Sequence, residues 1–297
     1  MTVSVGHDPI VAGVDGSASA LHAVRWAARE AARYRVPLRL VHVSYLVPEP
    51  PEEPTEDAGW LIEQRRQWLA QAADAARAVA DDLEIGTELR GGTVAKALVE
   101  ESASARLIVL GERGLEGFAD LLLGSVPAAV AAHARCPVVV IRSSTMDNPP
   151  PADGPVVVGV DGSELSDAAV GFAFAAASAR GVPLVAVHAW LDVWLAGAWT
   201  PVPMTVDWER IEADEHRVLA ERLAAWRATH PGVEVRSVVV PDRPATALLD
   251  AAGEAQLLVV GSHGRGALAS LGLGSVSHTL LQHAPCPVAI VRTVAAR

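Results

Sequence analysis

The chain has 297 residues, 51% of them hydrophobic, and a formal net charge of −11. This length fits two domains of about 150 residues each. The acidic balance argues against a nucleic-acid-binding surface and against binding to anionic membranes, since both require a basic patch. No apolar run reaches the roughly 18 residues of a membrane span, and the residues before Ile10 are not expected to be a secretory signal. With only two cysteines, we expect a cytoplasmic protein without disulfides.

Short aliphatic runs alternate with helical patterns along the first half of the chain. These runs are too short for helices and are typical of buried parallel strands. Strands are predicted at 10–14, 37–43, 85–90, 107–110 and 138–141, and helices at 18–34, 60–82, 94–102 and 125–134. The acidic, proline-rich segment 46–58 is expected to be a solvated loop. In the helix 60–82, the side chains expected to face the core are Leu61, Trp68, Ala72, Ala75 and Val79.

The second half repeats the first. Residues 10–17, Ile-Val-Ala-Gly-Val-Asp-Gly-Ser, match residues 156–163, Val-Val-Val-Gly-Val-Asp-Gly-Ser, and Cys136-Pro137-Val138 matches Cys286-Pro287-Val288. The alanine-rich run 168–179 is expected to be a buried helix. The repeat predicts domains at 1–143 and 156–297, joined by a proline-rich linker at 144–155.

Strands that alternate with helices predict a doubly wound, five-stranded parallel α/β sheet in each half, with strand order 3-2-1-4-5. In this order the connections after strands 1 and 4 run to opposite faces, and ligands bind in the crevice between them. Asp15 ends strand 1 and Gly111 begins the loop after strand 4, so the two should face each other across this crevice. Asp161 and Gly261 should do the same in the second half.

A glycine-rich loop follows strand 4 in both halves. The first reads Gly111-Glu112-Arg113-Gly114, nine residues, then Gly124-Ser125, and the second reads Gly261-Ser262-His263-Gly264, nine residues, then Gly274-Ser275. Bare backbone N–H groups and the positive end of the following helix dipole suit a phosphate. We therefore predict a nucleotide-phosphate site in each half.

Side chains around each loop could support the same anion. Ser125 and Ser275 stand at the start of the last helix, where each can cap it and donate to a phosphate oxygen. The basic groups Arg113, His263 and Arg265 could neutralise phosphate charge. Because the two loops differ in these groups, we expect unequal affinities, with the second site the more typical.

Other candidate residues have more than one interpretation. Asp15 and Asp161 could accept hydrogen bonds from ribose, or hold a divalent ion such as Mg²⁺ against phosphate, or only cap the next helix. The strand residues His42 and His188 are expected to be hydrogen-bonded core histidines. Cys136 and Cys286 are expected to be buried and inert. The tryptophan-rich segment 190–208 is expected either to cover a pocket or interface or to pack as an ordinary loop.

Taken together, Gly-x-x-Gly-x9-Gly-Ser after strand 4, Val-Asp-Gly-Ser after strand 1 and Cys-Pro-Val before the last strand closely resemble the universal stress proteins of the ATP-binding branch. The resemblance spans nearly the whole chain as a tandem pair. It implies a Rossmann-like, adenine nucleotide alpha hydrolase-like fold with ATP as ligand. It also implies cytoplasmic residence, pairing of domains through their last strands as an intrachain pair or a homodimer, and a role in stress or dormancy adaptation.

The resemblance also implies the contacts of individual residues. Asp15 and Asp161 would lie at the ribose, and Val43 and Ala189 would present their backbone to adenine. Pro127 stands where the second half has Ser277, so a hydroxyl donor is expected to be missing from the first site. The remaining ATP-binding residues would be Gly13, Val14, Gly111, Arg113, Gly114, Gly124, Ser125 and Val126 in the first half, and Gly159, Val160, Gly261, His263, Gly264, Arg265, Gly274, Ser275, Val276 and Ser277 in the second.

Three hypotheses about function follow. The first is a binding module in which ATP is a regulatory ligand whose occupancy alters contacts with an unidentified protein partner. The second is a slow ATPase or phosphotransferase, although phosphoryl transfer also needs a group that orients the nucleophile and no convincing base is identifiable. The third is a nucleotide-free interaction protein, against which the intact glycine spacing in both halves argues.

Overall fold

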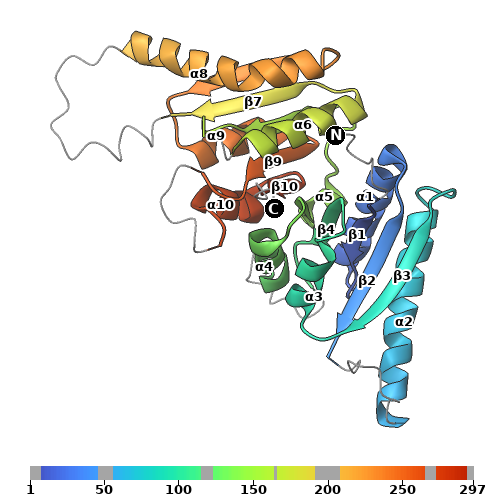
Figure 1. Ribbon diagram of the computed structural model, residues 1–297. Helices are drawn as coiled ribbons and strands as arrows, with labels where there is room; N and C mark the ends of the chain where they lie inside the picture. Colours follow the sequence, from blue (N-terminus) through green and yellow to red (C-terminus); the bar gives the residue numbers. More distant parts are fainter. Residues whose placement is uncertain are drawn as a thin grey trace. The chain divides into compact units, whose positions relative to one another are not determined.

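The computed structural model describes residues 8–45, 56–114, 123–163, 166–190, 208–264 and 272–292. The chain divides into two compact units, Met1–Asp147 and Asn148–Arg297. Each unit contains five parallel strands and the helices that connect them (Figure 1). This is the α/β class that the alternating sequence pattern predicts.

The first unit has the predicted topology. Its parallel strands lie in the order β3-β2-β1-β4-β5, which is the doubly wound order 3-2-1-4-5. Most strand side chains are aliphatic and buried, because helices cover both faces of a parallel sheet. The strands are β1 (Ile10–Gly13), β2 (Leu38–Ser44), β3 (Ile85–Gly91), β4 (Leu107–Gly111) and β5 (Val138–Ile141).

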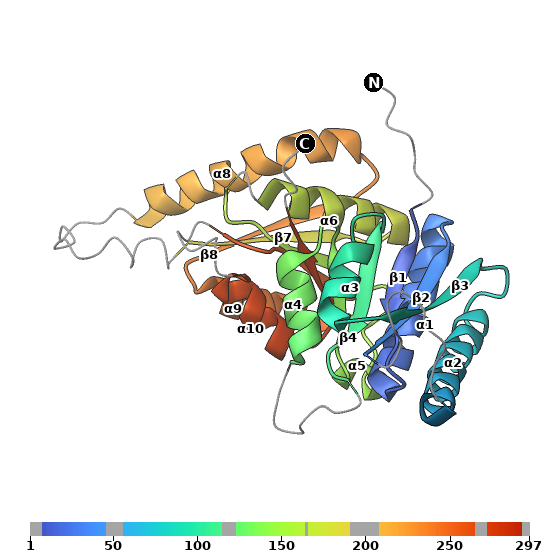
Figure 2. The same cartoon turned by 60° about the horizontal axis from the view of Figure 1, so that its bottom comes forward.

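The helices of the first unit form two layers. Helices α1 (Ala18–Tyr34) and α2 (Glu56–Arg77) pack together on one face of the sheet, and α3 (Val94–Glu101) and α4 (Ser125–His133) pack together on the other (Figure 2). The side-chain hydroxyl of Ser17 caps α1 by accepting from Ala20 N at 3.1 Å. The helix ends at Arg35, which adopts the left-handed conformation with φ 53°.

Helix α2 differs from its prediction in position and in buried face. It begins at Glu56, inside the segment that we expected to be a loop, and ends at Arg77 instead of continuing to residue 82. Its buried side chains are Leu69, Ala72, Ala73 and Ala76, so of the five predicted residues only Ala72 is fully buried. Acidic residues are common in loops and also at helix starts, so composition alone did not distinguish the two here. The rest of the predicted loop, 46–55, lies outside the described residues.

The second unit repeats this architecture with the order β10-β9-β6-β7-β8. The buried alanine-rich helix is confirmed as α6, which ends before Gly181 at φ 66°. The strands are β6 (Val156–Gly159), β7 (Leu184–Ala189), β8 (Val235–Val240), β9 (Leu257–Gly261) and β10 (Val288–Val291). The helices are α6 (Asp167–Arg180), α8 (Trp208–Thr229), α9 (Pro244–Ala251) and α10 (Ser275–His283).

The segment predicted as a linker has structure at both of its ends. Residues Ser144–Asp147 form a single helical turn, α5, in which the buried Thr145 lies 2.8 Å from His22 Nε2 of α1. Gln256 Nε2 of the second unit donates to the carbonyl of Gly154 at 2.6 Å. These contacts attach residues 144–147 to the first unit and Gly154 to the second.

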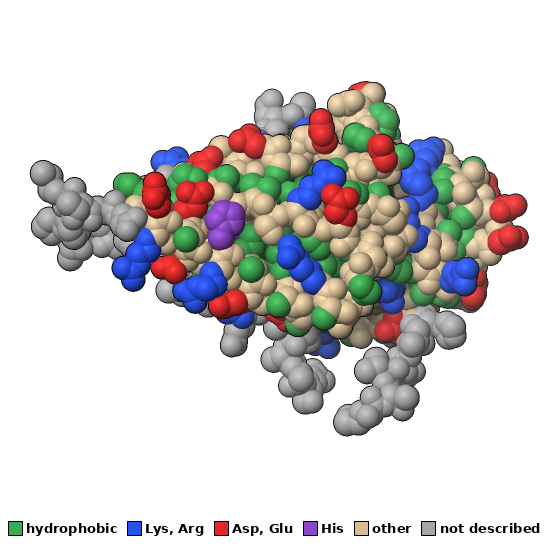
Figure 3. Space-filling view, turned by 90° about the horizontal axis from the view of Figure 1, so that it is seen from above, with side chains coloured by type: hydrophobic (Ala, Val, Ile, Leu, Met, Phe, Trp, Pro, Cys, Tyr) green, Lys and Arg blue, Asp and Glu red, His purple; other side chains and the backbone are tan. Residues whose placement is uncertain are grey.

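Within the described part of the chain, no helix has the length and apolarity to cross a bilayer. The exposed face of α8 is charged with both signs, and Arg217 pairs there with Asp214 at 3.0 Å and with Glu221 at 3.6 Å. The face seen in Figure 3 likewise shows acidic and basic side chains interspersed.

Candidate functional site

The turn after β1 fixes the carboxylate of Asp15. Asp15 Oδ1 accepts from the backbone N–H of Ser17 at 2.9 Å, and the intervening Gly16 has a φ of +86°, which only glycine adopts readily. The helix cap is Ser17 and not Asp15. The interpretation of Asp15 as the cap of α1 is therefore wrong, and its carboxylate is oriented by the turn instead.

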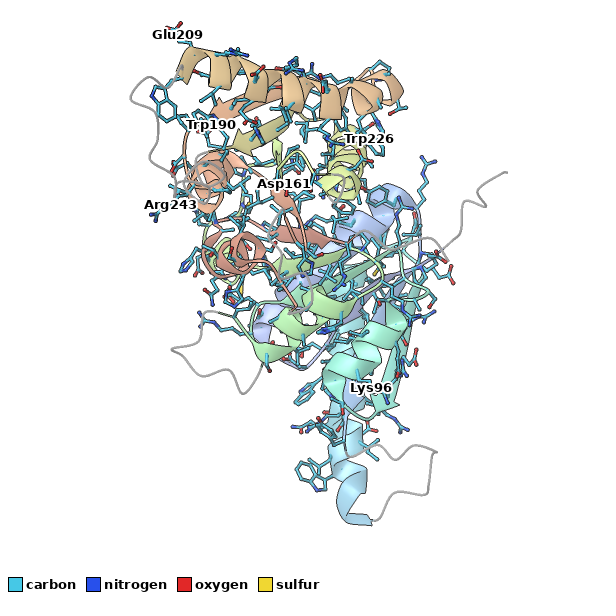
Figure 4. The ribbon with its side chains drawn as sticks, turned by 60° about the vertical axis from the view of Figure 1, so that its left-hand side comes forward. Lys96, Asp161, Trp190, Glu209, Trp226 and Arg243 are labelled. Atoms are coloured by element: carbon cyan, nitrogen blue, oxygen red, sulfur yellow. The ribbon has the colours of Figure 1, made fainter. Side chains whose placement is uncertain are left out.

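The turn after β6 has the same construction. Asp161 Oδ1 accepts from Ser163 N at 2.9 Å and from Ser163 Oγ at 2.6 Å, and Gly162 has a φ of +76°. Figure 4 shows Asp161 within the second unit, where it follows β6. Both halves thus hold one carboxylate in a defined orientation at the carboxyl end of the central strand.

The spacing of the glycine motif is explained by closure of the loop. Gly124 N donates to Glu112 O at 2.8 Å, and Gly274 N donates to Ser262 O at 2.9 Å. A Cβ on Gly124 would lie 3.1 Å from the same Glu112 carbonyl oxygen, so this position is tight for any larger residue. Each hydrogen bond joins the two ends of its loop and brings the last glycine beside the start of the next helix. Residues 115–122 and 265–271 of the loops lie outside the described residues.

The structure brings each loop against the aspartate, as the topology predicts. A Cβ built on Gly114 would lie 2.7 Å from Asp15 Oδ2, and one built on Gly264 would lie 2.9 Å from Asp161 Oδ2. Both distances are shorter than real side chains tolerate. The bare Cα atoms of Gly114 and Gly264 therefore allow the loop backbone and the carboxylate to approach each other closely.

The serines after the loops do not cap their helices. The N-cap residues are Gly124 for α4 and Gly274 for α10, and neither helix has a side-chain cap. Ser125 and Ser275 are the first helical residues, which corrects the predicted capping role. The first N–H groups of a helix have no intrahelical acceptor. Among the described residues, no N-cap side chain accepts from the N–H groups at the starts of α4 and α10, which lie beside the aspartate-bearing crevices.

Ser277 has a structural role that the sequence did not reveal. Its side chain is 3% exposed, and its hydroxyl donates to Gly261 O at 2.7 Å, which ties α10 to the end of β9. Its proton is therefore directed to the backbone. In the first unit Pro127 removes this tie, and it also removes a backbone N–H from the first turn of α4. The difference between the halves at this position concerns backbone donors as well as a hydroxyl.

The basic groups of the two loops have different surroundings. Arg113 Nε lies 3.7 Å from Oε1 of the buried Glu112, and Arg142 Nη1 lies 2.8 Å from Oε2 of the same carboxylate. His263 Nδ1 lies 3.1 Å from Ser262 Oγ, while its Nε2 is buried and has no hydrogen-bond partner among the described residues. The first loop thus holds its arginine beside an acid, whereas the second presents an imidazole nitrogen without one. Arg265 lies outside the described residues.

The strand histidines are core residues, as predicted. His42 Nδ1 contacts Val14 O at 2.6 Å, and His188 Nδ1 contacts Val160 O at 2.6 Å. Because a carbonyl only accepts, both Nδ1 atoms carry the proton. The backbone N–H groups of Val14 and Val160 donate to Val41 O and Val187 O across the sheet.

The surroundings of the other side of the imidazole ring differ between His42 and His188. His188 Nε2 lies 2.8 Å from Glu215 Oε2 of α8. The ring of His42 instead meets the Trp68 ring edge-on at 5.5 Å, and burial lowers the pKa of His42.

Several glycines of the predicted sites have packing roles. A Cβ on Gly13 would lie 2.6 Å from Leu110 Cδ2, and one on Gly159 would lie 3.0 Å from Leu248 Cδ1. A Cβ on Gly111 would lie 2.9 Å from the backbone carbonyl carbon of Ser19 in α1. These glycines let neighbouring elements approach the strand ends and so shape the crevice.

Trp190 begins the tryptophan-rich segment that was expected to cover a pocket or to pack as a loop, of which residues 191–207 lie outside the described residues. It follows Ala189 at the end of β7, and its side chain is only 2% exposed, beside the beginning of α8 (Figure 4). Its ring lies 5.9 Å from that of Trp208, and its buried Nε1 has no hydrogen-bond partner in the part of the chain that the structure describes. The tryptophan-rich composition was the available signal. In the first half, Val43 occupies the position of Ala189 and is 7% exposed.

The cysteines are buried and reduced. Burial raises the pKa of Cys136 and of Cys286 to about 12, so both are thiols at neutral pH. No group of three or more potential metal-ligating His, Cys, Asp or Glu side chains occurs among the residues that the structure describes.

Two doubly wound domains in tandem, each with an oriented aspartate facing a glycine loop, define a class of α/β proteins with ligand crevices at the strand ends. The Universal stress protein family model matches residues 6–142 and again residues 154–292. The chain belongs to this family and carries two of its domains, each with the adenine nucleotide alpha hydrolase-like fold.

Individual relatives agree with this assignment. A universal stress protein of Mycobacterium bovis is 42% identical over 289 residues, which cover 95% of this chain and 96% of the relative. One of Mycolicibacterium smegmatis is 41% identical over 295 residues, with coverage of 95% and 96%. The crystal structure of a universal stress protein from Archaeoglobus fulgidus covers 96% of this chain and 98% of its own, with a TM-score of 0.68 at 20% identity, and supports the fold alone.

Proposed function

We propose that each unit binds ATP at the carboxyl ends of its strands and that the nucleotide is a regulatory ligand. The observation that carries this proposal is the close approach of Gly114 to Asp15, repeated by Gly264 and Asp161. A loop backbone without a Cβ lies there beside a carboxylate whose orientation is fixed by a turn. A ribose donates hydroxyl hydrogens, which a carboxylate accepts, while phosphates accept from backbone N–H groups.

The helix starts supply the second part of the proposed site. Helices α4 and α10 begin beside the loops without side-chain caps, so their first N–H groups and their dipoles favour a phosphate. The edge of adenine would meet the backbone at Val43 and Ala189. As the alternative to accepting from the ribose, Asp15 and Asp161 would hold a Mg²⁺ ion that neutralises phosphate charge.

The two proposed sites differ in donors. Helix α10 offers the N–H groups of Ser275, Val276 and Ser277, whereas Pro127 leaves α4 with those of Ser125 and Val126. The first loop also holds Arg113 beside Glu112. We expect the second unit to bind nucleotide more tightly.

We infer a regulatory role because no described residue beside the crevice is identified as the group that would orient a nucleophile for phosphoryl transfer. Both strand histidines are engaged with backbone carbonyls through Nδ1. The curated relatives are named universal stress proteins, and we propose a corresponding role in stress or dormancy adaptation, with nucleotide occupancy altering contacts with a protein partner.

The direct experiment is to denature the purified protein and to identify released nucleotide by mass and ultraviolet absorbance, with its amount per chain. Two ATP per chain would support both sites, and one would support the predicted inequality. Released ADP or AMP would favour hydrolysis over a regulatory ligand. If no nucleotide is released and calorimetry with ATP and Mg²⁺ shows no binding, the proposal is wrong and an interaction protein remains.

A further inference from the structure

We propose that a groove on the second unit binds an amphipathic helix of a partner protein whose apolar stripe is flanked by lysine or arginine. The groove has a volume of about 580 Å³ and lies between α9 and the strands β7 and β8. Its apolar wall consists of Val185, Val238, Val240, Ala247 and Ala251. We call it the β8 groove, since β8 is the last strand at that end of the sheet order.

In the first unit, charged side chains occupy the corresponding place. Arg90 Nη1 donates to Glu101 Oε1 at 2.5 Å, and Arg39 Nη1 donates to Glu101 Oε2 at 3.0 Å. Glu88 adds a contact to Arg90 Nε at 3.8 Å. This ion-pair network spans β2, β3 and α3.

Strand register identifies the counterparts without ambiguity. Leu38 pairs with Ile85 in the first sheet as Leu184 pairs with Val235 in the second, and α3 and α9 have the same length. Arg39, Glu88, Arg90 and Glu101 therefore correspond to Val185, Val238, Val240 and Ala251. Four charged residues of one repeat are replaced by small apolar residues in the other.

The replacement leaves apolar surface accessible. Val185, Val238 and Val240 are only half-buried, because α9 packs on β6 and β7 and does not cover β8. A clustered apolar surface with a polar rim marks an interaction site more often than an isolated exposed valine does. Sheet faces in α/β domains are normally covered by helices, so a helix is the element that fits this position.

The acidic residues at the rim of the groove indicate that the partner is basic. The groove is bordered by Asp242, Asp250 and Glu254. Arg236, the one basic residue among the described residues that line it, is bonded to Glu234 at 2.8 Å. The exposed Arg243 precedes α9 (Figure 4) but does not line the groove. An acidic rim around an apolar floor favours an apolar stripe with basic flanks.

The test uses the first unit as the template for a blocking variant. The double substitution Val240→Arg with Ala251→Glu restores the pair that closes the first unit, so the variant should fold. The probe is a fluorescein-labelled Leu–Lys peptide of about 18 residues, long enough for five helical turns, and its Leu–Glu counterpart. Anisotropy measures affinity, and valine methyl chemical shifts locate the contact. Circular dichroism confirms the fold of each variant.

We expect the Leu–Lys peptide to bind the full chain at least about tenfold more tightly than the double variant, which is about 1.4 kcal/mol. It should shift the methyl signals of Val185, Val238 and Val240. The double substitution Asp250→Asn with Glu254→Gln should weaken binding of the Leu–Lys peptide and make that binding less dependent on salt. Asp74→Asn, at an exposed position in the first unit, should change neither.

Three results would overturn the proposal. The first is equal binding of the Leu–Lys peptide to the full chain and to the double variant, and the second is equal binding of the Leu–Glu peptide. The third is self-association of the chain that the double variant abolishes, because the groove would then be an interface between copies.

Discussion

Gly114 lies against the carboxylate of Asp15 so closely that a methyl group on its Cα would come within 2.7 Å of Oδ2. The second unit repeats the relationship between Gly264 and Asp161 at 2.9 Å. Neither glycine has a positive φ, so alanine meets no backbone penalty at either position. Glycine is therefore required for a steric reason: a larger residue would clash with the aspartate carboxylate.

This relationship predicts how Gly264→Ala acts. The new methyl group should displace the Asp161 carboxylate or the loop and weaken nucleotide binding at the second site by about tenfold or more, about 1.4 kcal/mol. In an Asp161→Ala background the same change should cost little further, because the group that it displaces is already gone. Calorimetry with ATP and Mg²⁺ measures both effects. Gly253→Ala, which meets no atom within 4 Å, is the matched control. Additive losses in the double variant would contradict the steric explanation.

Topology made the aspartate–loop contact predictable from sequence. Parallel strands at a switch point bring their carboxyl ends together whatever the side chains are, so Asp15 could be placed opposite the loop that begins at Gly111 by strand order alone. That Gly114 is the loop residue in contact with Asp15 could not be predicted. Ser277 could not be placed in this way, because a serine near a helix start serves as cap, ligand donor or core hydrogen bond with the same sequence pattern. The start of α2 was missed because its acidic first turn resembles a loop in composition. Apolar strand residues predicted the strands well, but not that Val238 and Val240 lie half-exposed.

The buried hydroxyl of Ser277 should contribute to stability. Ser277→Ala removes the donor to Gly261 O and leaves this partly buried carbonyl without that bond, which costs about 1 kcal/mol or more. Denaturant midpoints measure the loss. Thr279→Ala removes the hydroxyl that donates to Ser275 O at the surface of the same helix, and its effect should be distinctly smaller. Equal losses would mean that the tie between α10 and β9 is not stabilising.

Glu112 should be important for the stability of the first unit. It is 2% exposed and faces both Arg113 and the buried Arg142. Glu112→Gln removes the charge that offsets these guanidinium groups, and loss of one partner of a buried ion pair costs about 3 kcal/mol. Asp74→Asn removes the partner of Arg77 in an exposed pair at 2.9 Å and should change stability by less than about 1 kcal/mol. If both variants unfold at the same denaturant concentration, the buried cluster is not stabilising.

The two buried cysteines should make the folded protein less stable at alkaline pH. Burial raises both thiol pKa values from 9.0 to about 12, so above pH 9 the unfolded chain releases protons that the folded chain retains. Stability must then fall as pH rises, by about 1 kcal/mol for each thiol between pH 9 and pH 10. Cys136→Ala with Cys286→Ala should therefore show a shallower loss of stability with pH over this range, although it is less stable at pH 7. Parallel pH profiles for the two proteins would contradict the assigned burial effect.

Pro127 offers a way to separate the backbone and side-chain contributions to the proposed first site. At this position the second unit has Ser277, whose hydroxyl is already bonded to Gly261 O, so the N–H is the donor that remains for a phosphate. Pro127→Ala restores only the N–H, and Pro127→Ser restores the N–H and the hydroxyl. A hydrogen bond to a charged group contributes about 1.5–3 kcal/mol, so both variants should tighten ATP binding by about tenfold or more, and to the same extent. The measurement is calorimetry in a Gly264→Ala background, where the second site is weakened. Tighter binding by the serine variant alone would assign the asymmetry to the hydroxyl, as the sequence first suggested. No change in either variant would mean that the start of α4 does not contact the nucleotide.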